Sequence, residues 1–178
     1  MLGVGQTFPQ FNLTAVVTAD LKTAFQTVHH DSYKNKWLAL FFWPKDFTFV
    51  CPTEMIEFGR LESEFKTRNT QLLGASIDSE FVHLAWRSQH PGLKDLPYPM
   101  LSDIKRELSS ELGILDPKAG VSQRATYLID PEGIIRFVMV TDLSVGRNPQ
   151  EVLRVLDALQ TGELCPCNWQ KGDDVLKI

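Results

Sequence analysis

The sequence predicts an α/β sandwich built on a mixed central β-sheet flanked by helices. Short apolar segments alternate along the chain with segments whose apolar residues recur at helical spacing. Two later strand-like segments flank Asp130-Pro131-Glu132-Gly133, a Pro/Gly turn typical of a hairpin. The 178 residues contain no internal repeat, low-complexity tract or linker, so we expect residues 1–178 to form a single domain.

The first half of the chain predicts two buried strands and the helices that follow them. Residues 37–43 are short, apolar and aromatic, which favours a buried strand. Residues 53–69 predict a helix, because apolar side chains fall there at helical spacing: Met55, Phe58, Leu61 and Phe65. Residues 71–77 predict the second strand, and Ser79 can cap a helix that runs to about Ser88.

A third strand and a third helix continue this alternation. Residues 98–101 predict a short strand. Ser102 or Asp103 can cap a helix that extends through Leu112, and Gly113 suits the C-terminal end of that helix.

The last third of the chain predicts a hairpin and a final helix. Residues 125–129 and 134–140 supply the two hairpin strands on either side of the Pro/Gly turn. Asn148 can cap a helix that has Pro149 at its first position, and Gly162 suits the end of that helix. The helix presents apolar residues at helical spacing: Val152, Leu153, Val155, Leu156 and Leu159.

The resulting order, β-α-β-α-β-α-β-β-α, is compatible with a thioredoxin-like fold. In such a fold a parallel β-α-β core precedes a hairpin and a last helix. The remaining tail, about residues 163–178, is expected to form a C-terminal arm.

Composition and charge exclude several classes of function. The net charge is −4, which argues against a general binder of nucleic acid or of anionic membranes. The longest clean apolar run, residues 37–43, is far too short to span a membrane. The N-terminus has no basic region followed by an apolar core, so the expected location is cytoplasmic.

The chain has three cysteines, Cys51, Cys165 and Cys167, which is an odd number for a structural disulfide framework. In a reducing compartment, cysteines are more often small buried apolar residues, metal ligands or redox catalysts. Cys165-x-Cys167 supplies only two ligands and the four histidines lack a matching local pair, so no metal site is expected. No flavin or nucleotide motif is visible, so no cofactor is expected either.

Cys51 has the sequence context of a reactive cysteine. A buried strand ends at Trp43, and a loop then leads to Cys51 at the expected start of a helix. The free N–H groups and partial positive charge of a helix N-terminus stabilise a thiolate, which is the nucleophilic form of cysteine. Thr48 lies three residues earlier, so one turn of chain can bring its hydroxyl beside the sulfur. The alternative is that Cys51 only fills a gap in the core.

The neighbouring residues favour the reactive interpretation through a resemblance. Pro44-x-x-x-Thr48-x-x-Cys51 resembles the peroxiredoxin active-site motif, and Phe49-Val50-Cys51-Pro52-Thr53-Glu54 is similar to its form in the typical two-Cys branch. Within that branch the likeness is to the bacterial alkyl hydroperoxide reductase type. Other segments resemble the family in family order: Asp78-Ser79, Pro99-Met100-Leu101-Ser102-Asp103, Ser144-Val145-Gly146-Arg147 and Cys165-Pro166-x-Asn168-Trp169. The likeness covers essentially the whole chain.

This resemblance implies a thiol peroxidase that reduces hydrogen peroxide and organic hydroperoxides in antioxidant defence. Cys51 would attack the peroxide and become a sulfenic acid. By the same resemblance, the Thr48 hydroxyl would hydrogen-bond the peroxide, and Pro44 would shield the pocket from water.

Three charged residues match the family's supporting groups. Arg124 matches the arginine that stabilises the thiolate and polarises the peroxide, although an arginine at a strand start is usually a surface charge. Glu54 matches the acid that orients this arginine, and otherwise it is only a favourable charge at a helix N-terminus. Arg147 matches a second, supporting arginine.

The resemblance also assigns the second thiol and the partners. Cys165 matches the resolving cysteine, which in the family belongs to the partner subunit's arm, so it implies an obligate homodimer and often a ring of five dimers. Cys165-x-Cys167 resembles the variant in alkyl hydroperoxide reductases that work with a separate CxxC disulfide reductase, AhpD. Cys167 is then an auxiliary thiol that passes on the disulfide, or it is inert. Thioredoxin and a dedicated flavoprotein remain alternative reductants.

Two other functions compete with peroxide reduction. A thioredoxin-type disulfide reductase needs a CxxC at the helix start, and Glu54 stands where its second cysteine belongs. A redox-regulated holdase chaperone is the non-enzymatic alternative. The preferred peroxide is left open by the sequence.

Overall fold

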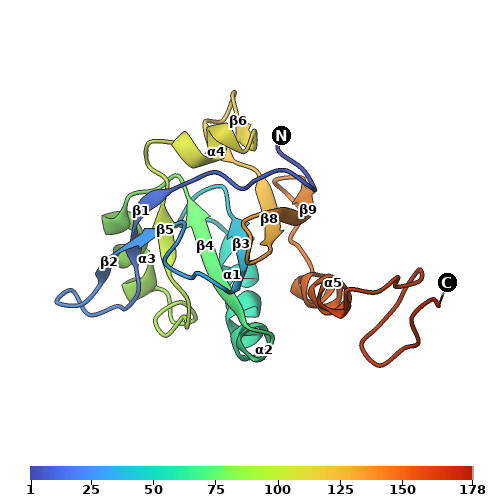
Figure 1. Ribbon diagram of the computed structural model, residues 1–178. Coiled ribbons are helices and arrows are strands. Elements are labelled where there is room, and N and C mark those ends of the chain that lie inside the picture. Colours follow the sequence, from blue (N-terminus) through green and yellow to red (C-terminus); the bar gives the residue numbers. More distant parts are fainter. Residues whose placement is uncertain (178) are drawn as a thin grey trace.

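A computed structural model describes residues 1–177, and one mixed seven-stranded sheet forms its centre, in the order β2-β1-β5-β4-β3-β8-β9 (Figure 1). The strands of this sheet are β1 (Asn12–Val16), β2 (Phe25–His29), β3 (Trp37–Phe42), β4 (Thr70–Ser76), β5 (Met100–Ser102), β8 (Arg124–Ile129) and β9 (Ile135–Thr141). A small separate ladder joins β6 (Leu115–Asp116) to β7 (Val121–Ser122). The helices are α1 (Cys51–Arg60), α2 (Glu62–Thr67), α3 (Glu80–Gln89), α4 (Glu107–Glu111) and α5 (Pro149–Thr161). Within residues 1–177 no helix has the length and apolar character needed to cross a membrane.

The strand pairing confirms the expected α/β class with a mixed sheet. β3 pairs with β4 and β4 with β5, both in parallel, and the helices α1, α2 and α3 lie in the two crossovers between them. β8 and β9 form the expected hairpin, and β8 lies antiparallel to β3. The carboxyl end of β3 therefore lies inside the sheet, next to the carboxyl end of β4 and the beginning of β8.

Alternation along β3 divides the core between the two faces of the sheet, because successive side chains of a strand point to opposite sides. Ala39 and Phe41 face the cluster that contains side chains of α1, α2, α3 and α5. Leu38, Leu40 and Phe42 face the other cluster, which α4 and the N-terminal segment cover. The β3–α1 connection thus leads from the middle of the sheet onto its more heavily covered face.

Several expected elements differ from those observed. The helix expected over residues 53–69 is two helices, because the backbone at Leu61 leaves helical geometry with φ −96° and ψ 1°. β1 and β2 were not predicted, since most of their residues are exposed or half-buried and they form no apolar run. β5 begins at Met100 and not at residue 98, because Pro99 has no N–H to donate to a ladder.

The helix expected from residue 103 to 112 is also shorter, since α4 begins only at Glu107. The Asp103 carboxylate nevertheless caps it from a distance by accepting from the N–H groups of Leu108 at 3.1 Å and Ser109 at 2.8 Å. Arg106 adopts a left-handed backbone with φ 59°, and this turn separates the cap from the helix. Gly113, with φ 69°, ends the helical segment as expected.

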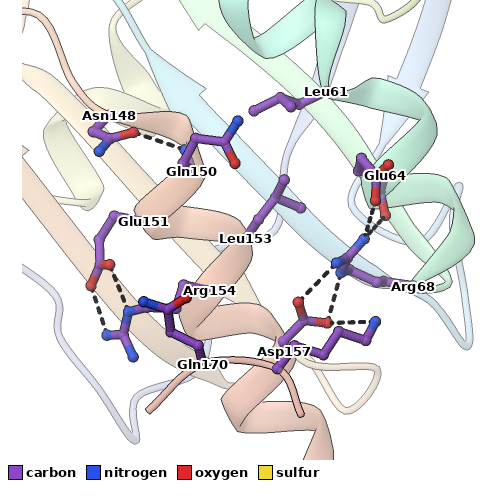
Figure 2. A pocket seen from close by; sticks show the side chains of 11 residues that line it. Leu61, Glu64, Arg68, Asn148, Gln150, Glu151, Leu153, Arg154, Asp157 and Gln170 are labelled. Atoms are coloured by element: carbon purple, nitrogen blue, oxygen red, sulfur yellow. Dashed lines mark hydrogen bonds and ion pairs between the residues drawn. The ribbon is translucent and has the colours of Figure 1, made fainter. Parts of the chain in front are cut away.

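A partly buried ion pair joins α5 to Arg68, the residue that follows α2 (Figure 2). Arg68 donates from Nε and Nη2 to the two carboxylate oxygens of Asp157, at 2.7 and 2.8 Å, and it also contacts Glu64. Beside this pair, Arg154 donates to both oxygens of Glu151 and to the carbonyl of Trp169 at 2.8 Å. This last contact and the ion pair of Lys171 with Asp157 tie the C-terminal arm to α5, and the arm as a whole extends away from the sheet (Figure 1).

Candidate active site

Cys51 is the first residue of α1, at the end of the loop that leaves β3, as the sequence predicts. Its side chain is fully buried and belongs to the cluster on the α1 face of the sheet. Pro52 follows within the first helical turn, where a missing N–H costs no helical hydrogen bond. The sulfur therefore lies at the positive end of a helix and is shielded from bulk water.

Arg124, the first residue of β8, lies directly beside this sulfur. Its Nη1 is 3.4 Å from the Cys51 Sγ, and its Nε donates to the Leu143 carbonyl at 2.8 Å. The guanidinium is buried and carries a permanent positive charge. A permanent positive charge at this distance stabilises the thiolate form of Cys51.

Glu54 joins Arg124 to Arg147. Its Oε2 accepts from Arg124 Nη1 at 2.6 Å, and its Oε1 accepts from Arg147 Nε at 2.7 Å and from the Arg147 backbone N–H at 2.9 Å. Burial raises the pKa of Glu54, but hydrogen bonds and charge from Arg147, with charge from Arg124, outweigh burial and leave the pKa lowered. The carboxylate is therefore ionised at neutral pH.

The three buried groups Glu54, Arg124 and Arg147 carry one net positive charge, since two guanidinium groups face one carboxylate. A buried charge needs a partner, and a thiolate at Cys51 supplies the missing negative charge. The arrangement thus favours an anion at the position of the sulfur.

Arg147 acts at a distance from the sulfur and holds the carboxylate. Its Nη1 donates to the Ala125 carbonyl at 2.7 Å and to the Thr126 hydroxyl at 3.2 Å. Its guanidinium lies over the rings of Phe41 and Phe58, with distances of 5.4 and 5.8 Å to their centroids. These contacts fix Arg147, and through it Glu54 and Arg124, in one orientation.

Thr48 is the expected site residue that the structure places differently. Its hydroxyl donates to the Lys45 carbonyl at 3.1 Å, and no hydrogen bond joins it to Cys51 among residues 1–177. The reason is local, because Phe47 adopts a left-handed backbone with φ 55° and the Thr48 hydroxyl closes the turn that this residue creates. Pro44 is buried at the start of the same loop.

Cys165 and Cys167 lie on the arm beyond α5. Cys165 is half-buried, with its Sγ 3.5 Å from the Thr161 hydroxyl oxygen and 3.7 Å from the Ala158 carbonyl oxygen. Cys167 is exposed, and neither thiol forms a disulfide within residues 1–177. The structure thus brings Cys51, Glu54, Arg124 and Arg147 together and leaves the two arm cysteines outside this group.

The sequence analysis did not single out two buried residues beside the site. Asp46 lies in the loop that leads to Cys51, and its carboxylate faces the ring of His83 on α3. The available signal was the spacing of His83 and Trp86, which places both on the buried side of the helix expected after Ser79.

Two family models match the chain. Residues 4–138 match the model described as the AhpC/TSA family, and residues 158–178 match that of the C-terminal domain of 1-Cys peroxiredoxin. The chain belongs to the AhpC/TSA family of peroxiredoxins. This membership makes it a thiol peroxidase, which is the function that the resemblance implied.

Individual relatives match this peroxiredoxin over nearly its whole length. Alkyl hydroperoxide reductase C of Mycolicibacterium smegmatis is 52% identical over 99% of this chain and 94% of its own length, and that of Mycobacterium tuberculosis is 54% identical over the same shares. The solved structure of Mycobacterium bovis AhpC is 53% identical, with a TM-score of 0.87 over 96% of this chain and 99% of its own. The reduced 2-Cys peroxiredoxin of Plasmodium vivax is 37% identical, with a TM-score of 0.92 over 99% of this chain and 94% of its own. These neighbours confirm the thioredoxin-like fold of the peroxiredoxin.

Proposed function

We propose that this peroxiredoxin reduces hydrogen peroxide and organic hydroperoxides through Cys51. The thiolate attacks one peroxide oxygen, the O–O bond breaks, and the other oxygen leaves with a proton as water or an alcohol. Cys51 is thereby oxidised by two electrons to a sulfenic acid. The observation that carries this proposal is the 3.4 Å contact between the Cys51 Sγ and the buried Arg124 guanidinium.

The other site residues have supporting roles in this proposal. Arg124 stabilises the thiolate and then the negative charge that develops on the leaving oxygen. Glu54 and Arg147 hold Arg124 in place, which their ion pairs of 2.6 and 2.7 Å support. The Thr48 hydroxyl turns from Lys45 to the peroxide when substrate binds, and Pro44 keeps bulk water from the sulfur.

We further propose that Cys165 of the partner subunit resolves the sulfenic acid, forming a disulfide and releasing water. The placement of Cys165 on an arm that extends away from the sheet supports an intersubunit reaction (Figure 1). The protein would then be an obligate homodimer in the cytoplasm, assembled further into a ring of five dimers.

The exposed Cys167 is proposed as the auxiliary thiol that passes the disulfide to a reductase. That reductase is an AhpD-like CxxC protein, thioredoxin or a flavoprotein. The relatives that match this chain give no support to the holdase chaperone, so no second function is proposed.

Oxidation with one equivalent of hydrogen peroxide tests the role of the two cysteines. We expect the wild type to form a covalent dimer on a non-reducing gel, with an intact mass equal to two chains joined by disulfides. The variants Cys51→Ser and Cys165→Ser are expected to stay monomeric on the gel, while Cys167→Ser still gives the dimer.

Two results would contradict parts of this scheme. A covalent dimer that persists in Cys165→Ser would make Cys167 the resolving cysteine. Oxidation of Cys51 in the wild type without any dimer would show that resolution is intramolecular or is carried out by an outside thiol.

A further inference from the structure

A buried carboxylate–imidazole pair lies beside the loop that leads to Cys51. Asp46 belongs to this loop and is 6% exposed, and His83 on α3 is fully buried. The His83 Nδ1 is 2.7 Å from the Asp46 Oδ2, and the His83 Nε2 is 3.1 Å from the Leu101 carbonyl oxygen on β5. The imidazole therefore connects the loop to the middle of the sheet.

The two contacts of His83 can both be hydrogen bonds only if the Asp46–His83 pair holds two protons between its carboxylate and its ring nitrogens. Both ring nitrogens face oxygen atoms, and the Leu101 carbonyl can only accept. Two hydrogen bonds form when the ring is protonated on both nitrogens, or when Asp46 carries a proton and donates it to Nδ1. If the pair has only one proton, His83 can bond Asp46 or Leu101 but not both. Loss of one proton therefore weakens the connection.

Burial and the neighbouring carboxylate of Asp78 favour retention of that proton. Asp78, two residues beyond β4, supplies a second carboxylate, and its Oδ2 accepts from the Asp46 backbone N–H at 2.8 Å. Trp43 supplies a neutral donor, with its Nε1 2.7 Å from the Asp46 Oδ1. Burial raises the pKa of Asp46, and the charge of Asp78 adds to the rise. Hydrogen bonding and charge from His83, with the hydrogen bond from Trp43, oppose this, and the pKa is raised overall.

The residue after Asp46 shows why the loop needs this connection. Phe47 adopts a left-handed backbone with φ 55°, which is unfavourable for an aromatic residue and persists only where surrounding contacts enforce it. Its ring packs on Trp86, with 5.9 Å between centroids, and Trp86 lies three residues after His83 on the same side of α3. Two consecutive loop residues, Asp46 and Phe47, thus contact residues one helical turn apart on α3, shortly before Thr48 and Cys51.

We propose that His83 is a positioning residue for peroxide reduction, which holds the loop of Pro44, Asp46 and Thr48 in place through its bond to the Asp46 carboxylate. This inference rests on the proposed function, because it assigns His83 to the same reaction at Cys51. His83 lies outside the group of residues around the sulfur, and it acts only through Asp46.

Two amide substitutions separate the two contacts of the ring. Asparagine places an amide N–H₂ near the position of Nδ1 and keeps the donor to Asp46, whereas glutamine places one near Nε2 and keeps the donor to Leu101. We expect His83→Gln to slow the first turnover of Cys51 with hydrogen peroxide by about 10- to 100-fold. His83→Asn should remain within about threefold of the wild type. Stopped-flow tryptophan fluorescence measures the rate, and His29→Asn, an exposed histidine on β2, is the control.

The pH profile supplies a readout that a purely structural role does not change. In the wild type, we expect the rate to decline at alkaline pH as the Asp46–His83 pair loses a proton. The amide of asparagine does not titrate, so this alkaline decline should be absent in His83→Asn. The unfolding free energies of both variants are measured in urea beside the rates.

Three outcomes would overturn the inference. Rates for His83→Gln equal to the wild type would show that the bond to Asp46 is unimportant, and equal losses of rate and stability in both variants would show that His83 only fills the core. Identical alkaline limbs in the wild type and His83→Asn would also contradict it. Failure of the proposed function is distinguishable, because the wild type itself would then show no reaction of Cys51 with peroxide.

Discussion

Arg124→Ala is expected to slow the reaction of Cys51 with hydrogen peroxide by roughly 10²- to 10³-fold, the usual effect of removing one preorganised donor to a developing negative charge. The Arg124 Nη1 is the hydrogen-bond donor that the structure places on the Cys51 Sγ within residues 1–177, at 3.4 Å. Its removal therefore takes away stabilisation of both the thiolate and the leaving oxygen. Stopped-flow measurement of the second-order rate constant checks this prediction.

Two further substitutions define what Arg124 contributes. Arg124→Lys keeps the charge but not the planar fork, so it cannot serve Cys51, Glu54 and Leu143 together, and an intermediate rate is expected. Arg136→Ala removes a half-exposed arginine of β9 that pairs with Asp130, and it should leave the rate unchanged. Equal rates for Arg124→Ala and Arg136→Ala would show that proximity of a guanidinium to the sulfur has no catalytic effect.

Glu54→Gln is expected to lower the free energy of unfolding by about 3–5 kcal/mol, because it leaves two buried guanidinium groups without their carboxylate. All three side chains are buried, and Glu54 accepts four hydrogen bonds from the two arginines. The neutral amide keeps the shape of the side chain, so the loss reports on charge and hydrogen bonding. Urea unfolding at neutral pH measures it, and Glu57→Gln is the control, since Glu57 is a half-exposed carboxylate on the same helix.

The pH dependence of the same comparison follows from the lowered pKa of Glu54. Its ordinary value is 4.5, and a carboxyl whose pKa is lower in the folded state stabilises that state at pH values above 4.5. This contribution is lost as the pH falls from 4.5 through the lowered value. The difference in unfolding free energy between wild type and Glu54→Gln should therefore be full at pH 7 and shrink in acid. A difference that is constant down to the acid range would contradict the ionised state assigned to Glu54.

Local sequence signals predicted the elements that carry the reactive cysteine. The apolar run of residues 37–43 and the helical spacing after Cys51 placed the thiol at a strand–loop–helix junction, and the structure confirms this. The caps at Ser79 and Asn148 accept from backbone N–H groups as expected. Such features are predictable because each depends on residues only a few positions apart.

The site itself required contacts that no local pattern encodes. Glu54 contacts Arg124, 70 positions away in the chain, and Arg147, 93 positions away. The sequence analysis grouped these residues through the family resemblance and not through their spacing. Asp46 and His83 are 37 positions apart and belong to no motif that the sequence analysis used, so their pairing was missed. The contact of the Thr48 hydroxyl with the Lys45 carbonyl was also missed, because it depends on the left-handed turn at Phe47, which no local pattern predicts.

The central claim is that Cys51 is the thiol that takes up the peroxide oxygen, and trapping its sulfenic acid tests this most directly. A double variant, Cys165→Ser with Cys167→Ser, retains Cys51 alone among the three cysteines. It would be treated with one equivalent of hydrogen peroxide in the presence of dimedone and examined by intact mass and peptide mapping. We predict one dimedone adduct per chain, located on Cys51 and formed far faster than on free cysteine. No adduct, or an adduct that forms no faster than on free cysteine, would contradict the claim.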